Sequence, residues 1–504
     1  QILFIVLLTV PAVWQIVTPG FFPMHDDIQV ARIQQMFVAL KSGQFPVRWV
    51  PDLGYGYGYP IFNFYNPLPY YFGPVFMFIG FDALAATKLM FIFPVILSGI
   101  SMFIFSKLFL SDFASGIAGL LYVYAPYHAV QIYVRGAVAE YWAYAILPLV
   151  FYAIWKKKIV LGALSLAALI LSHNLTSFMS IPLISILIFI KLLTEKKKIL
   201  LFTIYCLLFT FGLGLSIFFW LPSILESSKT GVDQMVFEKF DSPSKHVVYP
   251  LQLWSGVWGY GGSSSGIDDG LSFQVGKVHL IGSLIAIVIW LYGYIARKSN
   301  FFFNHSNPSN HLITFAIVGL ILSVFMLLPL SRPIWDAFPI LSYIQFPWRF
   351  LTFASLFSSI LTAWVIFKTM GVYETSVDSQ MFRKLLFSPL LFVFCSLFIF
   401  YSLPFFQPKF KFPITVDQLI SREKLVWDYS KISDEYLPKG FIRPINAEVA
   451  MRVDNKQNQL LVDKLKEPTS VRKAANLISL FTVMIFITFI IIISAKKHGQ
   501  NISG

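Results

Sequence analysis

Two adjacent carboxylates follow the first apolar stretch of the sequence, in the run Pro23-Met24-His25-Asp26-Asp27. A carboxylate at a membrane surface is costly unless it is solvated, paired or used in chemistry. Such a group can take a proton from the hydroxyl of an acceptor. Asp is also a good helix N-cap, so Asp26 can cap the helix that follows while Asp27 acts as the base. A weaker alternative is a divalent metal ion, Mg²⁺ or Mn²⁺, held by His25 and Asp27.

Arg135 and Glu140 lie in a short polar run, Tyr133-Val-Arg-Gly-Ala-Val-Ala-Glu140, between two apolar stretches. A guanidinium there can neutralise a phosphate or diphosphate. The Glu140 carboxylate can orient that arginine or bind an acceptor. A purely structural ion pair between the two residues is the alternative.

Three further polar residues stand at the ends of apolar stretches. His173 and Asn174 form a turn that is too short to be a domain, and Arg349 follows Trp348 at the start of another stretch. Arg349 can grip an anion or anchor its helix at the membrane interface. A lone His such as His173 can equally be a packing residue.

The run Gly54-Tyr-Gly-Tyr-Gly-Tyr-Pro60 alternates glycine with tyrosine. Glycine allows close backbone approach, and tyrosine offers a flat ring with a polar tip. Tyr57 and Tyr59 are therefore candidates for binding a sugar or a lipid head group. The alternative is an aromatic belt at the membrane interface.

The elements that must position these residues belong to a very apolar chain. Of its 504 residues, 57% are hydrophobic and 13% are charged, whereas a soluble domain has about 25% charged residues. This number of charged side chains is too small to cover the surface of a soluble fold of this length. Lipid must therefore solvate most of the exterior. The composition predicts an all-α polytopic membrane protein and excludes a free soluble enzyme, a nucleic-acid-binding module and a disordered scaffold. Cys206 and Cys395 lie inside apolar runs, which argues against a disulfide framework.

Apolar stretches near the ~20 residues that cross a bilayer recur along the chain. Twelve spans are predicted, at 1–18, 85–106, 113–129, 138–155, 159–172, 175–193, 199–221, 277–296, 311–330, 347–368, 385–404 and 475–495. The first lacks the features of a cleaved signal peptide and is interpreted as a retained helix.

The first outer loop, residues 19–84, is expected to contain interfacial helices. Val30, Ile33, Phe37 and Leu40 have helical spacing and predict a helix whose apolar face lies in lipid. Segment 61–82 is apolar but interrupted by three prolines, which favours a re-entrant or interfacial element over an additional span.

Basic loops indicate the orientation of the chain. With twelve spans, five Lys/Arg clusters fall on one side, which the positive-inside rule makes the cytoplasm: 156–158, 196–198, 297–298, 383–384 and 496–497. Both termini are then cytoplasmic, and every candidate site residue emerges on the extracytoplasmic face of the plasma membrane. Most of the net charge of +14 therefore reports orientation and not an acidic partner.

This topology divides the chain into three parts. A transmembrane module covers 1–404 and includes the outer loops 19–84 and 222–276. A small extracytoplasmic segment, called the late segment below, covers 405–474, and a final helix with a cytoplasmic tail covers 475–504. The stretch 255–270 is rich in Gly and Ser and is interpreted as a flexible loop that could act as a lid.

Five motifs look like those of the bacterial membrane family named "6-pyruvoyl-tetrahydropterin synthase-related": His25-Asp26-Asp27, Arg135-Gly136 with Glu140, His173-Asn174, Phe346-Pro347-Trp348-Arg349 and Asp434-Glu435-Tyr436-Leu437-Pro438. Nothing in the sequence suggests pterin chemistry. The family is in turn similar to the GT-C class of multispan glycosyltransferases. This resemblance implies a GT-C-like fold, a polyprenyl-phosphate-linked sugar donor and transfer on the extracytoplasmic face. It also implies Asp27 or Asp26 as the base, with Arg135 and Arg349 stabilising the departing lipid phosphate.

The predicted function is transfer of that sugar to a glycan, lipid or protein acceptor, with inversion at the anomeric carbon. One alternative is a transporter or flippase of lipid-linked sugar or polysaccharide. Another is a non-catalytic scaffold of an envelope assembly complex. The expected partners are the lipid bilayer, donor and acceptor, without nucleic acid. The candidate site comprises Asp27 and Asp26 as catalytic residues, and Arg135, Glu140, His173, Asn174, Arg349, His25, Tyr57 and Tyr59 as binding residues.

Overall fold

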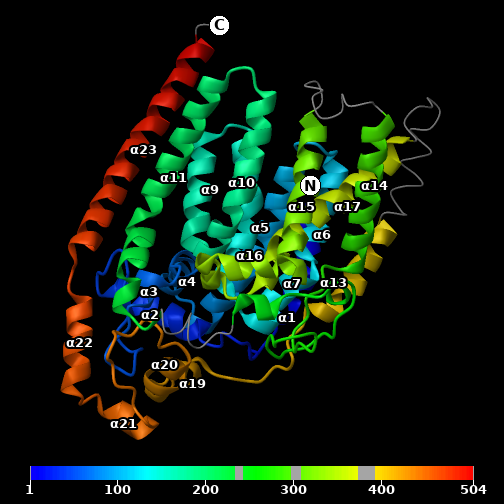
Figure 1. Ribbon diagram of the computed structural model, residues 1–504. Coiled ribbons are helices and arrows are strands. Elements are labelled where there is room, and N and C mark those ends of the chain that lie inside the picture. The colour runs from blue at the N-terminus through cyan, green and yellow to red at the C-terminus, as the bar shows by residue number, and fades with distance from the viewer. Residues whose placement is uncertain (1, 233–241, 297–307, 373–391, 503–504) are drawn as a thin grey trace.

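The computed structural model describes residues 2–232, 242–296, 308–372 and 392–502. Within these ranges the chain is helical and adds four isolated β-bridges. Figure 1 shows long helices running side by side, with short helices gathered at one end of the bundle. The all-α prediction is therefore confirmed for the described residues.

Eight helices are long and apolar enough to cross a membrane. They are α5 (Ala83–Ser106), α8 (Val138–Trp155), α10 (Asn174–Thr194), α11 (Lys198–Glu226), α14 (Lys277–Ala296), α15 (Pro308–Leu327), α17 (Leu351–Val372) and α23 (Ser470–Ile502). Shorter apolar helices occupy the remaining predicted spans: α1 (Ile2–Val17), α6 (Asp112–Val123), α9 (Ile159–Ser172) and Phe392–Phe405. The polytopic architecture is confirmed, whereas the count of twelve spans stays a prediction. Residues 385–391 of one predicted span lie outside the described residues, as do the clusters 297–298 and 383–384.

Segment 61–82 forms two short helices, α3 (Ile61–Phe64) and α4 (Leu68–Phe78), instead of one continuous helix. Pro69 stands in the first turn of α4, where the missing N–H costs nothing. At a rise of 1.5 Å per residue, α4 covers roughly 16 Å, about half of a bilayer's hydrocarbon core. This geometry agrees with the interpretation of 61–82 as an element that does not cross by itself.

Helix α2 (Gln29–Lys41) differs from its predicted role as a lipid-facing interfacial helix. Val30 and Ile33 are buried at 3% and 0% exposure within the protein. Ile33 packs so closely on α4 that a Cβ at Gly73 would lie 2.6 Å from its Cδ1 atom. The predicted lipid contact is wrong for Val30 and Ile33, whereas Phe37 and Leu40 are partly exposed. Apolar spacing by itself does not distinguish a lipid surface from a protein surface.

Helix α8 is the most enclosed of the candidate spans and carries Glu140 near its first turn. One turn further on, the ring of Tyr144 stacks on Tyr122 of α6 with centroids 3.9 Å apart and planes 10° apart. Each hydroxyl donates to the other residue's backbone carbonyl, at 2.8 and 2.7 Å. This reciprocal pair fixes the register of α8 and hence the position of Glu140.

The late segment contributes four short helices, α19 (Val416–Leu419), α20 (Ser430–Ile432), α21 (Ala447–Arg452) and α22 (Lys456–Lys466). They lie beside α2 and α3 at one end of the bundle (Figure 1). A buried ion pair anchors the chain that follows, because Arg472 Nε of α23 lies 2.7 Å from Glu226 Oε2 of α11. Arg48 of the first loop adds a hydrogen bond of 2.7 Å to Asn476 Oδ1. The first loop and the late segment are thus joined at the same end of the molecule.

The turn between α9 and α10, at residues 172–174, also lies at this end, beside the first loop, because Asn66 Nδ2 donates to Ile170 O at 2.8 Å. The lysine clusters 156–158 and 196–198 therefore lie at the opposite ends of these helices. The two clusters and the candidate site residues are separated by the length of the bundle, as the charge pattern predicts.

Candidate active site

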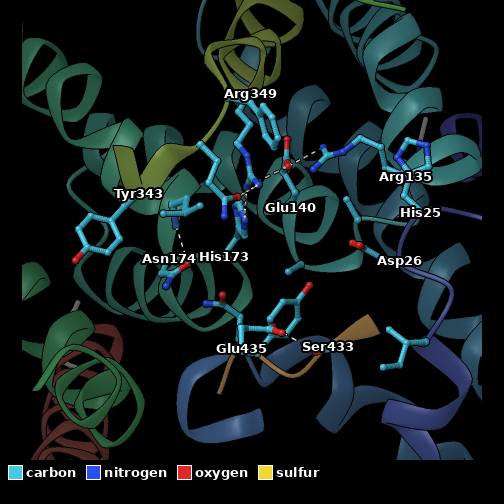
Figure 2. A pocket seen from close by; sticks show the side chains of 18 of the residues that line it. His25, Asp26, Arg135, Glu140, His173, Asn174, Tyr343, Arg349, Ser433 and Glu435 are labelled. Carbon is cyan, nitrogen blue, oxygen red and sulfur yellow. Dashed lines mark hydrogen bonds and ion pairs between the residues drawn. The ribbon is translucent and has the colours of Figure 1, made fainter. Parts of the chain in front are cut away.

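A cavity of about 530 Å³ opens at the end of the bundle that carries the short helices. Its walls come from segments far apart in the sequence, and Figure 2 shows their polar side chains pointing toward one space. Seven predicted site residues line it: His25, Asp26, Arg135, Glu140, His173, Asn174 and Arg349. The fold therefore brings together residues that the sequence places more than 300 positions apart.

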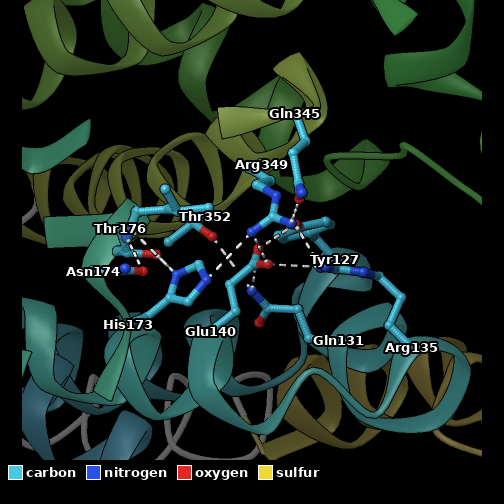
Figure 3. Close-up of polar contacts among 11 residues, drawn as sticks. Tyr127, Gln131, Arg135, Glu140, His173, Asn174, Thr176, Gln345, Arg349 and Thr352 are labelled. Atoms are coloured by element: carbon cyan, nitrogen blue, oxygen red, sulfur yellow. Dashed lines mark hydrogen bonds and ion pairs between the residues drawn. The ribbon is translucent and has the colours of Figure 1, made fainter. Parts of the chain in front are cut away.

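Glu140 is the centre of the charged wall (Figure 3). Its side chain is buried, and its Oε2 atom lies 2.8 Å from Arg135 Nη1 and 3.7 Å from Arg349 Nη1. Its Oε1 atom accepts hydrogen bonds from the Tyr127 hydroxyl and from Gln131 Nε2. Two guanidinium groups share this single carboxylate, so the wall carries one positive charge in excess.

Arg349 is fixed by groups on both sides. Its Nη2 atom donates to Gln345 Oε1 at 2.9 Å, and its Nη1 atom lies 3.3 Å from His173 Nε2. His173 Nδ1 is in turn 2.7 Å from Thr176 Oγ1. Burial lowers the pKa of His173 to about 3. The Glu140 carboxylate opposes this shift, and the positive charges of Arg349 and Arg135 add to it. The imidazole is therefore neutral at pH 7, and the positive charge of this wall belongs to the arginines.

Arg135 ends a π-helical turn, Val130–Arg135, and its guanidinium lies over the ring of Trp348 at 4.5 Å from the centroid. The next residue, Gly136, has a φ of +62°, which L side chains rarely adopt. A Cβ atom there would lie 2.2 Å from Met24 Sδ. Glycine is thus required for the first loop to approach Arg135.

The first loop pairs with this turn through its backbone. His25 N–H donates to Val134 O at 3.1 Å, and Asp26 N–H donates to Arg135 O at 2.9 Å. These bonds turn the Asp26 side chain into the cavity, whereas Asp27 is not among the lining residues. Burial raises the pKa of Asp27 to about 6, against the opposing effect of Lys424 in the late segment.

The predicted capping role of Asp26 is wrong. The residue at the cap position of α2 is Ile28, and no side-chain hydrogen bond caps this helix. Of the two adjacent acids, Asp26 lines the cavity and Asp27 does not, and the role of either as the base stays a prediction.

Tyr57 and Tyr59 do not line the cavity, which corrects their predicted contact with substrate. The Tyr57 hydroxyl accepts a hydrogen bond of 2.8 Å from Asn455 N–H. The fully buried Tyr59 hydroxyl accepts one of 3.2 Å from Tyr436 N–H and lies 3.5 Å from Ser433 Oγ. Both rings support the late segment, so they are scaffold residues of the site.

Binding of a divalent metal by His25 and Asp27 stays a prediction. His25 Nε2 lies 3.2 Å from the Tyr260 carbonyl oxygen, and Asp27 lies outside the cavity lining. The described residues contain no group of three or more His, Cys, Asp or Glu side chains suited to a metal ion.

The Gly/Ser-rich stretch 255–270 contributes Gly262 and Ser263 to the cavity wall. Ser263 Oγ lies 3.1 Å from His246 Nδ1, and the Tyr260 hydroxyl donates to Gln407 O at 2.8 Å. The stretch therefore covers the cavity beside His25, and its predicted motion as a lid stays a prediction.

Sequence reasoning missed two charged residues of the cavity, Arg32 and Glu435. Arg32 is 4% exposed on α2, and its Nη2 atom donates to Ser433 Oγ at 3.3 Å. The only signal for Arg32 was a charged residue within an apolar helical face. Glu435 stood out only as part of a motif in the late segment.

Fold and site together define a polytopic helical membrane protein of GT-C-like fold with a cavity of arginines and carboxylates at one end. The solved structure of the arabinofuranosyltransferase AftD from mycobacteria matches with a TM-score of 0.52 at 12% identity, covering 82% of this chain and 27% of AftD. A mutant form of AftD matches with a TM-score of 0.50 at 10% identity. These matches show the fold.

The chain belongs to the membrane protein family described as "6-pyruvoyl-tetrahydropterin synthase related domain", whose model matches residues 62–377. The predicted resemblance to this family is thereby confirmed. The matched range contains the motifs at Arg135, His173 and Arg349, whereas the motifs at 25–27 and 434–438 lie outside it. An uncharacterised protein of Lactococcus lactis subsp. cremoris is 26% identical over 244 residues, which is 45% of this chain and 40% of that protein. The chain thus spans less than half the length of this relative.

Proposed function

We propose that this chain is an integral membrane glycosyltransferase that moves a sugar from a polyprenyl-phosphate-linked donor to an acceptor hydroxyl. The observation that carries the proposal is the convergence of Arg135 and Arg349 on a cavity that Asp26 also lines. This arrangement supplies a cationic site for a leaving phosphate and a carboxylate for an attacking hydroxyl in one space (Figure 2).

The charges of the arginine wall suit the leaving group. A polyprenyl-phosphoryl sugar is a phosphodiester with one negative charge, and the departing polyprenyl phosphate gains a second charge as the bond to the anomeric carbon breaks. Guanidinium groups bind phosphate oxygens in a bidentate manner. Because charge develops during bond breaking, Arg135 and Arg349 would stabilise the transition state more than the bound donor. Glu140 holds both arginines in place before the donor binds.

Asp26 is the proposed general base. Its carboxylate accepts the proton of the acceptor hydroxyl while that oxygen attacks the anomeric carbon and the phosphate oxygen leaves. One displacement inverts the configuration at that carbon. In the proposed orientation the lysine clusters face the cytoplasm and the cavity faces the extracytoplasmic side of the plasma membrane.

The test is sugar transfer by the full chain in proteoliposomes, with a panel of polyprenyl-phosphoryl sugars that includes an arabinofuranosyl donor because AftD carries that activity in its name. Asp26→Asn should lower transfer by about 100-fold or more, as for removal of a general base. Asp27→Asn should stay within a few fold of the wild type. Arg349→Gln should lower transfer strongly, whereas the exposed Arg452→Gln serves as the matched control.

Unchanged transfer in both Asp26→Asn and Asp27→Asn would exclude a carboxylate base in this loop. Movement of intact lipid-linked sugar across the bilayer without transfer to any acceptor would favour the transporter alternative.

A further inference from the structure

The wall opposite the arginines comes from the late segment. Ser433, Glu435 and Tyr436 line the cavity there, and Figure 2 shows Glu435 on the far side of the cavity from Arg349. Tyr65 and Asn66 of the first loop complete this wall. It is therefore separated from the proposed phosphate site by the space in which a sugar would bind.

This wall is built rigidly. The ring of Tyr436 stacks on Phe64 with centroids 5.3 Å apart and planes 17° apart. Its N–H donates to the Tyr59 hydroxyl, and the carbonyl of Leu437 accepts a bond of 3.1 Å from Gly231 N–H. The first loop and the connection after α11 thus hold these residues in position before any ligand arrives.

The adjacent acids Asp434 and Glu435 have different roles. Asp434 forms an ion pair with Arg443 within the late segment. Glu435 Oε1 accepts a hydrogen bond of 3.3 Å from Ser433 Oγ, and among the described residues no cation lies within ion-pair distance of it. Its own backbone N–H and the charge of Arg32 also act on this carboxyl group. A carboxyl group has about four acceptor positions, so part of its capacity remains for a ligand in the cavity that it lines. Burial raises the pKa of Glu435 from its ordinary value.

The residue types of this wall fit a sugar better than the other acceptor classes. Carboxyl and amide groups form paired hydrogen bonds with neighbouring hydroxyls, and Tyr65 and Tyr436 add aromatic surface with polar hydroxyl groups to the cavity lining. A simple lipid alcohol would leave the buried polar groups unpaired, which is costly.

We propose that Glu435, with Tyr65 and Tyr436, forms the acceptor subsite and that the acceptor is a sugar. Glu435 binds two hydroxyls of the acceptor sugar and directs a third toward Asp26. Calling this site an acceptor subsite rests on the proposed glycosyl transfer. Sugar binding at Glu435 can nevertheless be measured without turnover.

The first experiment is equilibrium binding to the full chain in nanodiscs. The probes are radiolabelled n-octyl glycosides of glucose, galactose, mannose and arabinofuranose, with n-octanol as the lipid control. The wild type should bind at least one glycoside saturably and more tightly than n-octanol. Glu435→Gln should weaken this binding about 10-fold or more, and Glu435→Asp should restore part of it. The matched control is Glu423→Gln, an exposed acid of the same segment. Each variant is first checked for an unchanged thermal unfolding midpoint.

The second experiment separates the two substrates. With an active donor, Glu435→Gln should raise the KM for the octyl glycoside about 10-fold while the KM for the donor and the rate of donor hydrolysis by water change less than twofold. An equal loss of hydrolysis and transfer would overturn the acceptor assignment. Glycoside binding that is absent, or equal in the wild type and Glu435→Gln, would also overturn it, even if transfer occurs. Glu435-dependent binding without hydrolysis or transfer of any donor would instead refute the proposed glycosyl transfer and leave a sugar-binding site.

Discussion

The backbone N–H of Asp26 donates a hydrogen bond of 2.9 Å to the backbone carbonyl of Arg135. The proposed base and a proposed phosphate ligand are therefore held at a fixed separation by the main chain. Catalysis by paired groups depends on such fixed geometry, since misplacement by about 1 Å can cost roughly 100-fold in rate. The pairing depends on Gly136, which allows the two segments to meet.

Gly136→Ala should therefore inactivate the protein. The left-handed backbone costs about 1–2 kcal/mol for an L residue, and the contact with Met24 adds about 1–3 kcal/mol of overpacking. Gly43→Ala is a matched control, because Gly43 has a φ of +82° but a Cβ atom added there would have no neighbour within 4 Å. Thermal unfolding and transfer should both be affected far more at position 136. Equal effects at the two positions would show that the contact with Met24 is unimportant.

Glu140→Gln should destabilise the folded protein by about 3–5 kcal/mol, because it leaves Arg135 and Arg349 buried without a counter-charge. A phosphate bound between the arginines would replace that charge. Farnesyl phosphate should therefore raise the unfolding midpoint of Glu140→Gln more than that of the wild type, with farnesol as the uncharged control. Equal shifts in the two proteins, or an equal shift with farnesol, would contradict a phosphate site here.

The stability of the protein should depend on pH through Asp27. The pKa of this residue is about 6 in the folded chain, above the ordinary value of 3.8. A carboxyl group whose pKa is raised in the folded state stabilises the protein fully below about pH 3.8, and this contribution is lost as the pH rises through 6. The Asp27→Asn variant should not show this loss. Its free energy of unfolding relative to the wild type should therefore rise by up to about 3 kcal/mol from pH 4 to pH 7. Thermal unfolding as a function of pH measures the effect. A curve identical to that of the exposed control Asp454→Asn would disprove the raised pKa.

The buried pair of Arg472 and Glu226 should contribute strongly to the attachment of α23. Arg472→Gln leaves the Glu226 carboxylate buried at 1% exposure and should cost about 3–5 kcal/mol. The exposed pair of Arg452 and Glu448 is the control, and Arg452→Gln should cost at most about 1 kcal/mol. Denaturation in detergent compares the two variants, and similar losses would mean that burial does not set the strength of these pairs.

The fold was largely predictable because lipid imposes a simple requirement on the sequence. Helices that cross a bilayer need long apolar stretches, and such stretches occur at α5, α8, α10 and α23. Polar residues that interrupt them at one end, such as Arg135 and His173, were therefore recognisable as candidates for a common site.

The remaining details depend on contacts that local sequence does not encode. That Asp26 and not Asp27 lines the cavity depends on backbone pairing with Arg135, more than a hundred residues away. Arg32 was hidden on a helix whose apolar face packs on protein instead of lipid. Tyr59 looked like a substrate ligand because an exposed ring and a ring buried under the late segment have the same sequence signature.

The joint between the first loop and the end of the chain has a consequence for biosynthesis. Asp26 leaves the ribosome before α5 to α17, whereas Glu435 and the anchoring Arg472 follow these helices. A nascent chain that has been made as far as α17 therefore has both arginines of the wall, but the opposite side of the cavity is still missing. The cavity becomes complete only after the late segment has been translated, so a product truncated before that segment would occupy the membrane without a finished site.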